Sequence, residues 1–295
     1  MAQELEHRHV AVDGVRLHAV EAGSGPLVVL LHGFPEFWYS WRHQIPALAD
    51  AGFRVVAPDM RGYNVSDKPR GLAAYSGEAL AGDVCGLIKA LGEERAHVVG
   101  HDWGAQVAWE TAMRHPDRVD RLAILNVPHP VRMLEGLRTL RQLRRSWYMF
   151  FFQLPFVPEA ALRARDFAIP RRVLRRDSVS PDAFSEEDIE RFVDAWSQPG
   201  ALTAMLAYYR AAVRSPGAIR GVLGRGDGAP GVRVVEAPTL VIWGERDTAL
   251  GSELAEPDRR WVPNLIGVER LPDASHWVQN DAPERVNELL IDFLR

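Results

Sequence analysis

The stretch that most constrains the fold of this 295-residue chain runs from residue 98 to residue 105 and reads Val-Val-Gly-His-Asp-Trp-Gly-Ala. Two β-branched residues, which favour a strand, precede Asp102. Gly100 and Gly104 stand two positions to either side of that aspartate. A residue at a tight strand-to-helix turn is held in a strained conformation, and bulky neighbours would clash with the strand and helix. The pattern therefore predicts a buried strand, a sharp turn with Asp102 at its apex, and a helix.

The first 130 residues alternate short apolar strands with helical stretches, which is typical of a mainly parallel sheet. Residues 8–13 and 15–21 are expected to form a hairpin that turns at Asp13-Gly14. Continuous apolar runs are typical of strands that helices cover on both faces, and they occur at 27–31, 55–57 and 97–99. A further strand is expected at 119–125, and helices are expected at 41–51, 78–91 and 104–115.

The pattern changes after residue 130. From 131 to 215 the strand signals vanish and helix-like segments rich in Arg, Phe, Leu and Ala replace them. Strands return at 237–243 and 264–269, and an amphipathic helix follows at 283–294, with Asp281 placed to cap it. The glycine-rich residues 221–231 are expected to form a loop. We therefore predict an α/β core domain of residues 1–130 and 216–295, and a helical cap domain of residues 131–215.

A carboxylate at the apex of the turn predicts a particular chemistry. Carboxylates are ionised at neutral pH, so Asp102 would need no base before it attacks. It would be a poor nucleophile toward esters and amides, because the anhydride formed would revert. Displacement at a saturated carbon would instead give an alkyl ester of the protein, which water can open. Epoxides and alkyl halides fit this reaction. The competing interpretation is that Asp102 only caps the helix that follows it.

Hydrolysis of such an ester needs a base that activates water and a group that orients the base. His276 follows a predicted strand and precedes the last helix, and Asp247 follows the strand that ends at Trp243. Each residue alone could belong to an ordinary turn or loop, but their order and their places relative to the strands favour catalysis. Glu245 is the competitor of Asp247 as the orienting acid, and Asp273 is a weaker one.

These residues, together with three longer motifs, resemble the epoxide hydrolases of the α/β-hydrolase superfamily over nearly the whole chain. The motifs are His32-Gly-Phe-Pro-Glu36, Pro58-Asp-Met-Arg-Gly-Tyr63 and Gly100-His-Asp-Trp-Gly104. The resemblance implies the α/β-hydrolase fold, in which helices flank a mostly parallel central sheet and a helical cap (lid) is inserted between the two halves of the core. It also implies an oxyanion hole made by the amides of Phe34 and Trp103, and a cis peptide before Pro35.

The resemblance further points to two tyrosines in the cap. Tyr148 stands ahead of a Phe-Gln pair and Tyr209 is followed by arginine, as in the family's two cap motifs, with Tyr208 as the alternative. Opening an epoxide leaves a strongly basic alkoxide, and a phenol with a pKa of ~10 is a suitable acid to protonate it. The competing interpretation is that both tyrosines only pack the cap onto the core.

The substrate is expected to be small and apolar. Besides the two tyrosines, we expect Phe34, Trp103 and Phe152 to line its site. The cap also carries further aromatic residues, which favour an aryl or alkyl epoxide as the reactant beside water: Trp147, Phe150, Phe151, Phe156 and Trp196.

Two alternatives use the same fold. A haloalkane or haloacid dehalogenase shares the Asp nucleophile, and Trp103 could donate its indole N–H to a departing halide. Haloalkane dehalogenases, however, often have Asn where this chain has Phe34, and they lack the tyrosine pair. Fluoroacetate dehalogenases typically have Arg where this chain has Trp103, and they tend to have Trp at the position of Tyr148. A non-enzymatic ligand receptor would have a damaged catalytic triad, and here Asp102, Asp247 and His276 are all present.

Composition narrows the remaining classes of partner. A net charge of −4 gives no reason to invoke nucleic acid or an anionic membrane. The single cysteine, Cys85, fits a reducing compartment, and the polar N-terminus is unlike a signal peptide, so we expect a cytoplasmic protein without a membrane span. We expect neither a metal nor a cofactor, and we leave a homodimer open. The arginine-rich stretches 138–145 and 171–176 are interpreted as solvated helix faces rather than anion sites.

Overall fold

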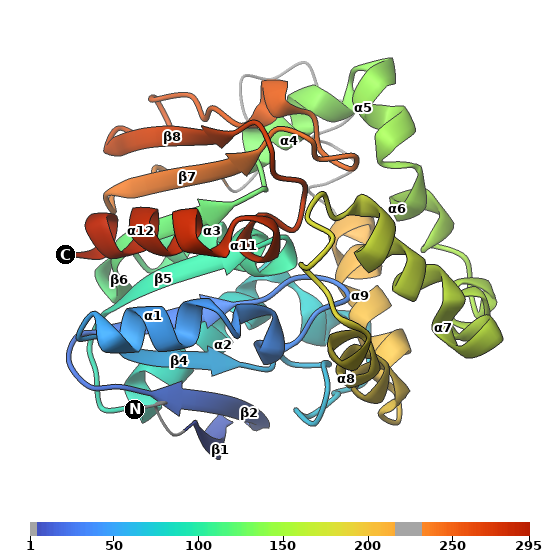
Figure 1. The fold of residues 1–295 in the computed structure, drawn as a ribbon, viewed down its shortest axis with the longest axis horizontal. Coiled ribbons are helices and arrows are strands. Elements are labelled where there is room, and N and C mark those ends of the chain that lie inside the picture. Colours follow the sequence, from blue (N-terminus) through green and yellow to red (C-terminus); the bar gives the residue numbers. More distant parts are fainter. Residues whose placement is uncertain (1–4, 216–231) are drawn as a thin grey trace.

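A central sheet organises the computed structural model of this chain, which describes residues 5–215 and 232–295 (Figure 1). Within these residues the sheet has eight strands in the order β1-β2-β4-β3-β5-β6-β7-β8. β1 and β2 pair antiparallel, as do β2 and β4, and the remaining neighbours are parallel. The strands are β1 (Glu6–Val12), β2 (Val15–Ala22), β3 (Leu27–Leu31), β4 (Arg54–Pro58), β5 (Ala96–His101), β6 (Val119–Leu125), β7 (Thr239–Gly244) and β8 (Leu265–Leu271). The mostly parallel sheet expected from the sequence is confirmed.

Helices cover both faces of this sheet, which explains why its central strand β3 is apolar throughout. All five residues of β3 are buried. α1 (Gln44–Asp50) packs with α12 (Pro283–Leu294) on one face, and α2 (Gly77–Ala90) packs with α3 (Trp103–Arg114) on the other (Figure 1). α1 begins three residues later than expected, because a short 3-10 helix, Trp38–Trp41, precedes it.

Helices alone connect β6 to β7 in the described part of the chain. They are α4 (Pro130–Leu137), α5 (Leu140–Arg145), α6 (Trp147–Phe151), α7 (Val157–Asp177), α8 (Glu186–Ser197) and α9 (Ala201–Arg214). α7 consists of two helices joined at residues 165–167, which have positive φ. This group lies beyond the carboxyl ends of the parallel strands, at the right of Figure 1. We call it the cap; its boundaries as a domain stay a prediction. Residues 221–231 lie outside the described residues.

The structure corrects one predicted helix cap. Ala282, rather than Asp281, occupies the N-cap position of α12, and no side chain caps that helix. Asp281 is the last residue of α11 (Val278–Asp281). Its carboxylate accepts hydrogen bonds from the backbone amides of Val179, Ser180 and Ser275, at 2.8 to 3.1 Å. Segments distant in the sequence thus bind the carboxylate that the local pattern had assigned to α12. Among the described residues, no helix is both long and apolar enough to cross a membrane.

Candidate active site

Asp102 lies at the apex of the turn between β5 and α3, with a φ of +48°. The turn requires glycine, because a Cβ on Gly104 would lie 2.0 Å from the carbonyl oxygen of Leu31, and one on Gly100 would lie 2.5 Å from the carbonyl oxygen of Gly104. The side chain of Asp102 makes no capping hydrogen bond to α3. The interpretation of this aspartate as a simple helix cap is therefore wrong, and its carboxylate is directed to other groups.

His276, in the loop after β8, lies next to Asp102, and Asp247, in the loop after β7, lies next to His276. His276 Nε2 lies 3.4 Å from Oδ2 of Asp102, and His276 Nδ1 lies 2.7 Å from Oδ2 of Asp247. The competing acids lie elsewhere, since Glu245 and Asp273 are exposed and each pairs with a surface arginine. The structure thus brings Asp102, His276 and Asp247 into one row.

The charges in this row control one another. Burial by itself would raise the pKa of Asp102, but the hydrogen bond and positive charge of His276, the charge of His101 and the Phe34 amide together lower it below its usual value. Burial lowers the pKa of His276, yet Asp247 and Asp102 outweigh that effect and raise this pKa well above the usual value. In this state Asp102 is a carboxylate and His276 holds a proton.

Asp247 is fixed by residues that the sequence argument missed. Asn126 donates its side-chain amide to Oδ2 of Asp247 at 2.8 Å, and the backbone amides of Ala249 and Leu250 donate to Oδ1, each at 2.8 Å. The available signal was a polar residue directly after the apolar strand β6, and Asn126 has a positive φ of 49° there. These bonds hold Asp247 ionised in the orientation that His276 needs.

A second buried pair, also missed, lies beside Asp102. His101 Nδ1 is 2.7 Å from the carboxylate of Glu36, and its Nε2 is 2.8 Å from the carbonyl oxygen of His276. Gln279 also donates to Glu36, at 3.1 Å. Burial would raise the pKa of Glu36, but the charge and hydrogen bond of His101 lower it below its usual range. The pair ties the loop after β3 to the backbone of His276.

The loop after β3 also reaches Asp102 directly. The amide of Phe34 donates to Oδ1 of Asp102 at 2.7 Å, and the peptide between Phe34 and Pro35 is cis. This approach requires Gly33, because a Cβ there would lie 2.3 Å from the Cβ of Asp102. Trp103 is the first residue of α3, and the first amides of a helix have no partner within the helix. Of the two predicted oxyanion donors, the Phe34 amide contacts the carboxyl group, and the Trp103 amide has no acceptor within its own helix.

Aromatic side chains from the cap complete the surroundings of Asp102. Tyr209, on α9, has its ring 4.9 Å from that of Trp103, 5.0 Å from that of Phe152 and 5.3 Å from that of Phe34. Tyr148, on α6, lies 5.9 Å from Tyr209, ring centre to ring centre. All five residues predicted to line the substrate site are thus brought together.

Burial, followed by the negative charge of Asp102, raises the pKa of Tyr148 and of Tyr209 above the usual value. Both phenols therefore keep their protons at neutral pH and can donate them. Tyr208, the alternative, is fully buried and donates its hydroxyl to the carbonyl oxygen of Arg61 at 2.7 Å. Its ring packs against Tyr63, Tyr75 and Trp103. Because the hydroxyl of Tyr208 is bound to Arg61, whereas the charge of Asp102 acts on Tyr209, the structure favours Tyr209 over Tyr208 as the second acid.

The remaining cap aromatics do not share one role. Trp147, Phe150 and Phe156 are exposed, and Trp196 is buried with its indole donating to the carbonyl oxygen of Pro35. Phe151 packs against Phe152 at the edge of the site. Of these five aromatic residues, only Phe151 packs against a predicted lining residue, because neighbouring positions on short helices point to different sides. The expectation that all five indicate an apolar substrate is wrong for the other four.

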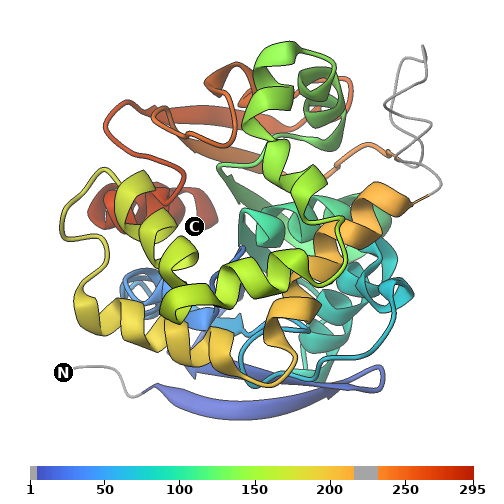
Figure 2. The ribbon, with the colours of Figure 1, turned by 90° about the vertical axis from the view of Figure 1, so that its right-hand side faces the viewer.

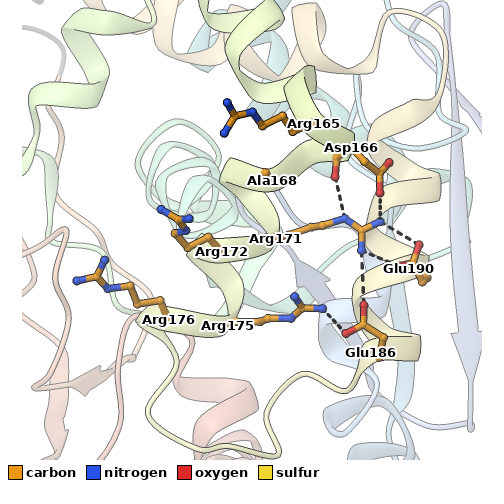
Figure 3. Close-up of a pocket in the computed structure, with 9 residues that line it drawn as sticks. All are labelled: Arg165, Asp166, Ala168, Arg171, Arg172, Arg175, Arg176, Glu186 and Glu190. Atoms are coloured by element: carbon orange, nitrogen blue, oxygen red, sulfur yellow. Dashed lines mark hydrogen bonds and ion pairs between the residues drawn. The ribbon is translucent and has the colours of Figure 1, made fainter.

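The arginines of α7 line a surface groove of about 620 Å³ (Figure 3). Arg171 pairs with Glu190 at 2.6 Å and with Asp166 at 2.7 Å, and Arg175 pairs with Glu186. These pairs fit the interpretation of residues 171–176 as an ordinary charged surface. The groove shares no lining residue with the cluster around Asp102. Within the described ranges, no group of His, Cys, Asp or Glu side chains is arranged to hold a metal ion.

Comparison with known proteins gives one family. The model of the α/β hydrolase fold matches residues 26–283. Epoxide hydrolase 3 of Xenopus tropicalis is 40% identical over 289 residues, which are 96% of this chain and 75% of that protein. The AB hydrolase superfamily protein YfhM of Bacillus subtilis is 43% identical over 292 residues, 97% of this chain and 96% of that protein. The crystal structure of a Bacillus megaterium epoxide hydrolase with an inhibitor superposes with a TM-score of 0.88 at 34% identity, covering 97% of this chain and 99% of that one.

Proposed function

This chain belongs to the α/β-hydrolase fold family and, within it, to the epoxide hydrolases, and from that premise we propose how its residues convert an apolar epoxide and water into a vicinal diol. The observation that carries the proposal is the position of Asp102. His276 Nε2 lies 3.4 Å from its ionised carboxylate, and the charge of that carboxylate helps to raise the pKa of Tyr148 and of Tyr209, which therefore keep their protons. A nucleophile, a base and two acids are thus present together.

In the first step, a carboxylate oxygen of Asp102 attacks a ring carbon of the epoxide and the carbon–oxygen bond of the ring breaks. Tyr148 and Tyr209 hydrogen-bond the leaving oxygen, and one of them gives it a proton. The products are an alkyl ester on Asp102 with a free hydroxyl group, and a phenolate. The phenolate regains its proton as His276 loses one.

His276 can become a base at this stage because its surroundings have changed. In the free enzyme two carboxylates raise the pKa of His276. Esterification removes the charge of Asp102, so the pKa of His276 falls and the neutral imidazole becomes accessible. His276 then takes a proton from water, and the hydroxide attacks the carboxyl carbon of Asp102. The amides of Phe34 and Trp103 stabilise the oxyanion. Its collapse breaks the ester bond, and the departing alkoxide takes the proton of the carboxylic acid that forms. The diol is released, Asp102 is a carboxylate again, and His276 keeps the proton that it took from water.

The test is to remove the base and trap the ester. His276→Ala mixed with styrene oxide should gain the mass of one substrate molecule in intact-protein mass spectrometry, because alkylation does not need the imidazole. The double variant His276→Ala/Asp102→Asn is the control and should gain no mass. The mechanism is wrong if His276→Ala gains no mass, or if the double variant gains as much.

The same geometry argues against a dehalogenase. The ring of Trp103 packs against that of Tyr209, and relatives and solved structures matched by this chain carry the name epoxide hydrolase. A halide ion leaves without a proton, so the two phenols near Asp102 would have no use there. A receptor is likewise disfavoured, since Asp102, His276 and Asp247 are in contact. We also propose a cytoplasmic location, supported by the single cysteine, Cys85.

A further inference from the structure

One face of the cap exposes an unusual amount of apolar surface. Twelve large apolar side chains are exposed among the described residues, and seven of them lie between residues 140 and 157. Leu140 is 72% exposed, Trp147 62% and Phe156 84%. We call the seven the apolar cap face: Leu140, Leu143, Trp147, Phe150, Leu154, Phe156 and Val157. Single exposed apolar residues are ordinary on proteins, whereas a cluster of this kind marks a contact surface.

Leu140 and Leu143 lie on α5, Trp147 and Phe150 lie on α6, and Val157 begins α7, while Leu154 and Phe156 lie in the turn between α6 and α7. Within α5 and within α6 the two exposed residues are three positions apart, a spacing that places both side chains on one side of their helix. In Figure 2 these helices form the layer nearest the viewer. The inner side of the same wall carries Tyr148 and Phe152, which contact the aromatic cluster around Asp102. The apolar cap face is therefore the outside of the wall that encloses the candidate active site.

The stretch of chain that carries this face is rich in arginine. Between residues 138 and 165 the chain has six arginines and a single acidic residue, Glu159, which pairs with Arg210 at 2.7 Å. Arg144 and Arg145 make no ion pair with any residue that the structure describes. The net charge of −4 is a sum over the whole chain and does not describe this stretch. Arg144 and Arg145 lie on α5, the helix that also carries the exposed Leu140 and Leu143.

We propose that the apolar cap face docks on the surface of a membrane that contains anionic lipids. Trp147, Phe150 and Phe156 would enter the boundary between headgroups and acyl chains, and the neighbouring arginines would pair with lipid phosphates. A second copy of the chain fits this face less well, because a symmetric dimer would place the two arginine clusters against each other. An apolar epoxide dissolved in lipid would then lie next to the wall of the site. Docking of the cap on a membrane does not depend on the proposed chemistry at Asp102.

Vesicle flotation of the intact enzyme tests this proposal. Wild type should float with vesicles of phosphatidylcholine and phosphatidylglycerol, much less with phosphatidylcholine alone, and less at high salt. Leu140→Ser/Phe156→Ser should weaken partitioning by about tenfold or more, and Arg144→Gln/Arg145→Gln by about fivefold for each arginine. Ile266→Ser, which changes a 63% exposed residue of the edge strand β8, is the matched control and should float like wild type. Arg16→Gln, on β2, is the corresponding charge control.

Hydrolysis of an epoxide dissolved in buffer should stay at the wild-type rate in all four variants, which separates this proposal from the mechanism. The proposal is overturned if wild type does not float with anionic vesicles at low salt, or floats equally well with phosphatidylcholine alone. It is also overturned if sedimentation shows a wild-type dimer that Leu140→Ser/Phe156→Ser dissociates, since the face would then bind a second copy.

Discussion

His276 lies between two carboxylates, and the proposed chemistry turns one of them into a neutral ester. Before the reaction, Asp102 and Asp247 both favour its charged form. After alkylation only Asp247 does. His276 is therefore a stable cation before alkylation, when Asp102 is ionised. Once the ester has formed, the imidazole loses its proton more easily and can act as a base. Alkylation of Asp102 by the substrate would thus change the protonation state of His276.

This coupling predicts different pH profiles for the two steps. The pKa of Asp102 is lowered, so its carboxylate should persist from neutral to mildly acidic pH and the alkylation rate should stay nearly constant. Ester hydrolysis needs neutral His276, so its rate should fall as pH falls through the pKa of His276 in the ester. Single-turnover tryptophan fluorescence at a series of pH values measures both rates. A parallel fall of the two rates would contradict the proposed coupling.

The tyrosine hydroxyls provide a second prediction at the residue scale. General acid catalysis contributes ~10²–10⁴-fold to a rate, so Tyr148→Phe and Tyr209→Phe should each slow alkylation by about tenfold or more, and the double variant should nearly abolish it. Ester hydrolysis should change little, because the alkoxide is neutral by then. Pre-steady-state alkylation rates are the measurement.

Tyr208→Phe is the matched control for Tyr209→Phe, since the two residues are neighbours on α9. It removes a buried hydroxyl bonded to the carbonyl of Arg61, which should cost about 1 kcal/mol of unfolding free energy. Its alkylation rate should nevertheless match that of wild type. If both Tyr148→Phe and Tyr209→Phe also alkylate at the wild-type rate, the assignment of these tyrosines as acids fails.

At the scale of elements, α11 connects the cap to the loop that carries His276. Asp281, at its end, accepts hydrogen bonds from the segment between α7 and α8 through one oxygen. The other oxygen accepts from the amide and hydroxyl of Ser275. One carboxylate thus holds a cap segment and the residue before His276 at the same time. The position of the catalytic histidine is therefore coupled to the seating of the cap.

Asp281→Ala should leave several amides without an acceptor and lower the free energy of unfolding by about 2 kcal/mol. Denaturant unfolding measures the loss, and hydrogen exchange locates it. The amides of Val179, Ser180 and Ser275 should lose protection, while those in the first turn of α12 should not. Selective loss of protection in α12 would mean that Asp281 stabilises that helix after all.

At the scale of the whole molecule, the cap and core together decide the class of substrate. The core supplies Asp102 and His276, and the cap supplies Tyr148, Tyr209 and Phe152. The aromatic cluster offers apolar surface and two hydroxyl donors, but no positively charged residue is among the predicted lining residues. A neutral apolar molecule with an oxygen that gains charge fits this combination.

A substrate panel tests that conclusion. We expect higher kcat/KM for styrene-type, aliphatic and cyclic epoxides than for chloroalkanes or fluoroacetate. The physical reason is that the two phenols stabilise a departing alkoxide and give a halide no comparable advantage. Faster turnover of any halide than of every epoxide would overturn the assignment.

The sequence by itself determined the features that depend on short stretches of chain. Buried strands such as β3 follow from continuous apolar runs, and the turn at Asp102 follows from glycines two positions away on either side. The order of Asp102, Asp247 and His276 after three strands was enough to predict one cluster, because parallel strands present their carboxyl ends at the same edge of a sheet. Each of these signals is read within a few residues of the feature it predicts.

Only the tertiary structure decided which of several chemically similar side chains lies in the active site and which partners a given side chain binds. Tyr208 and Tyr209 are adjacent, but neighbours on a helix point about 100° apart, and packing turns one toward Arg61 and the other toward Asp102. Asp281 binds residues about a hundred positions away in preference to the helix beside it. The net charge of the chain likewise does not reveal that arginines of α5 lie close in the sequence to exposed aromatic side chains of the cap. Side-chain direction is set by the packing of distant segments, and no local pattern encodes it.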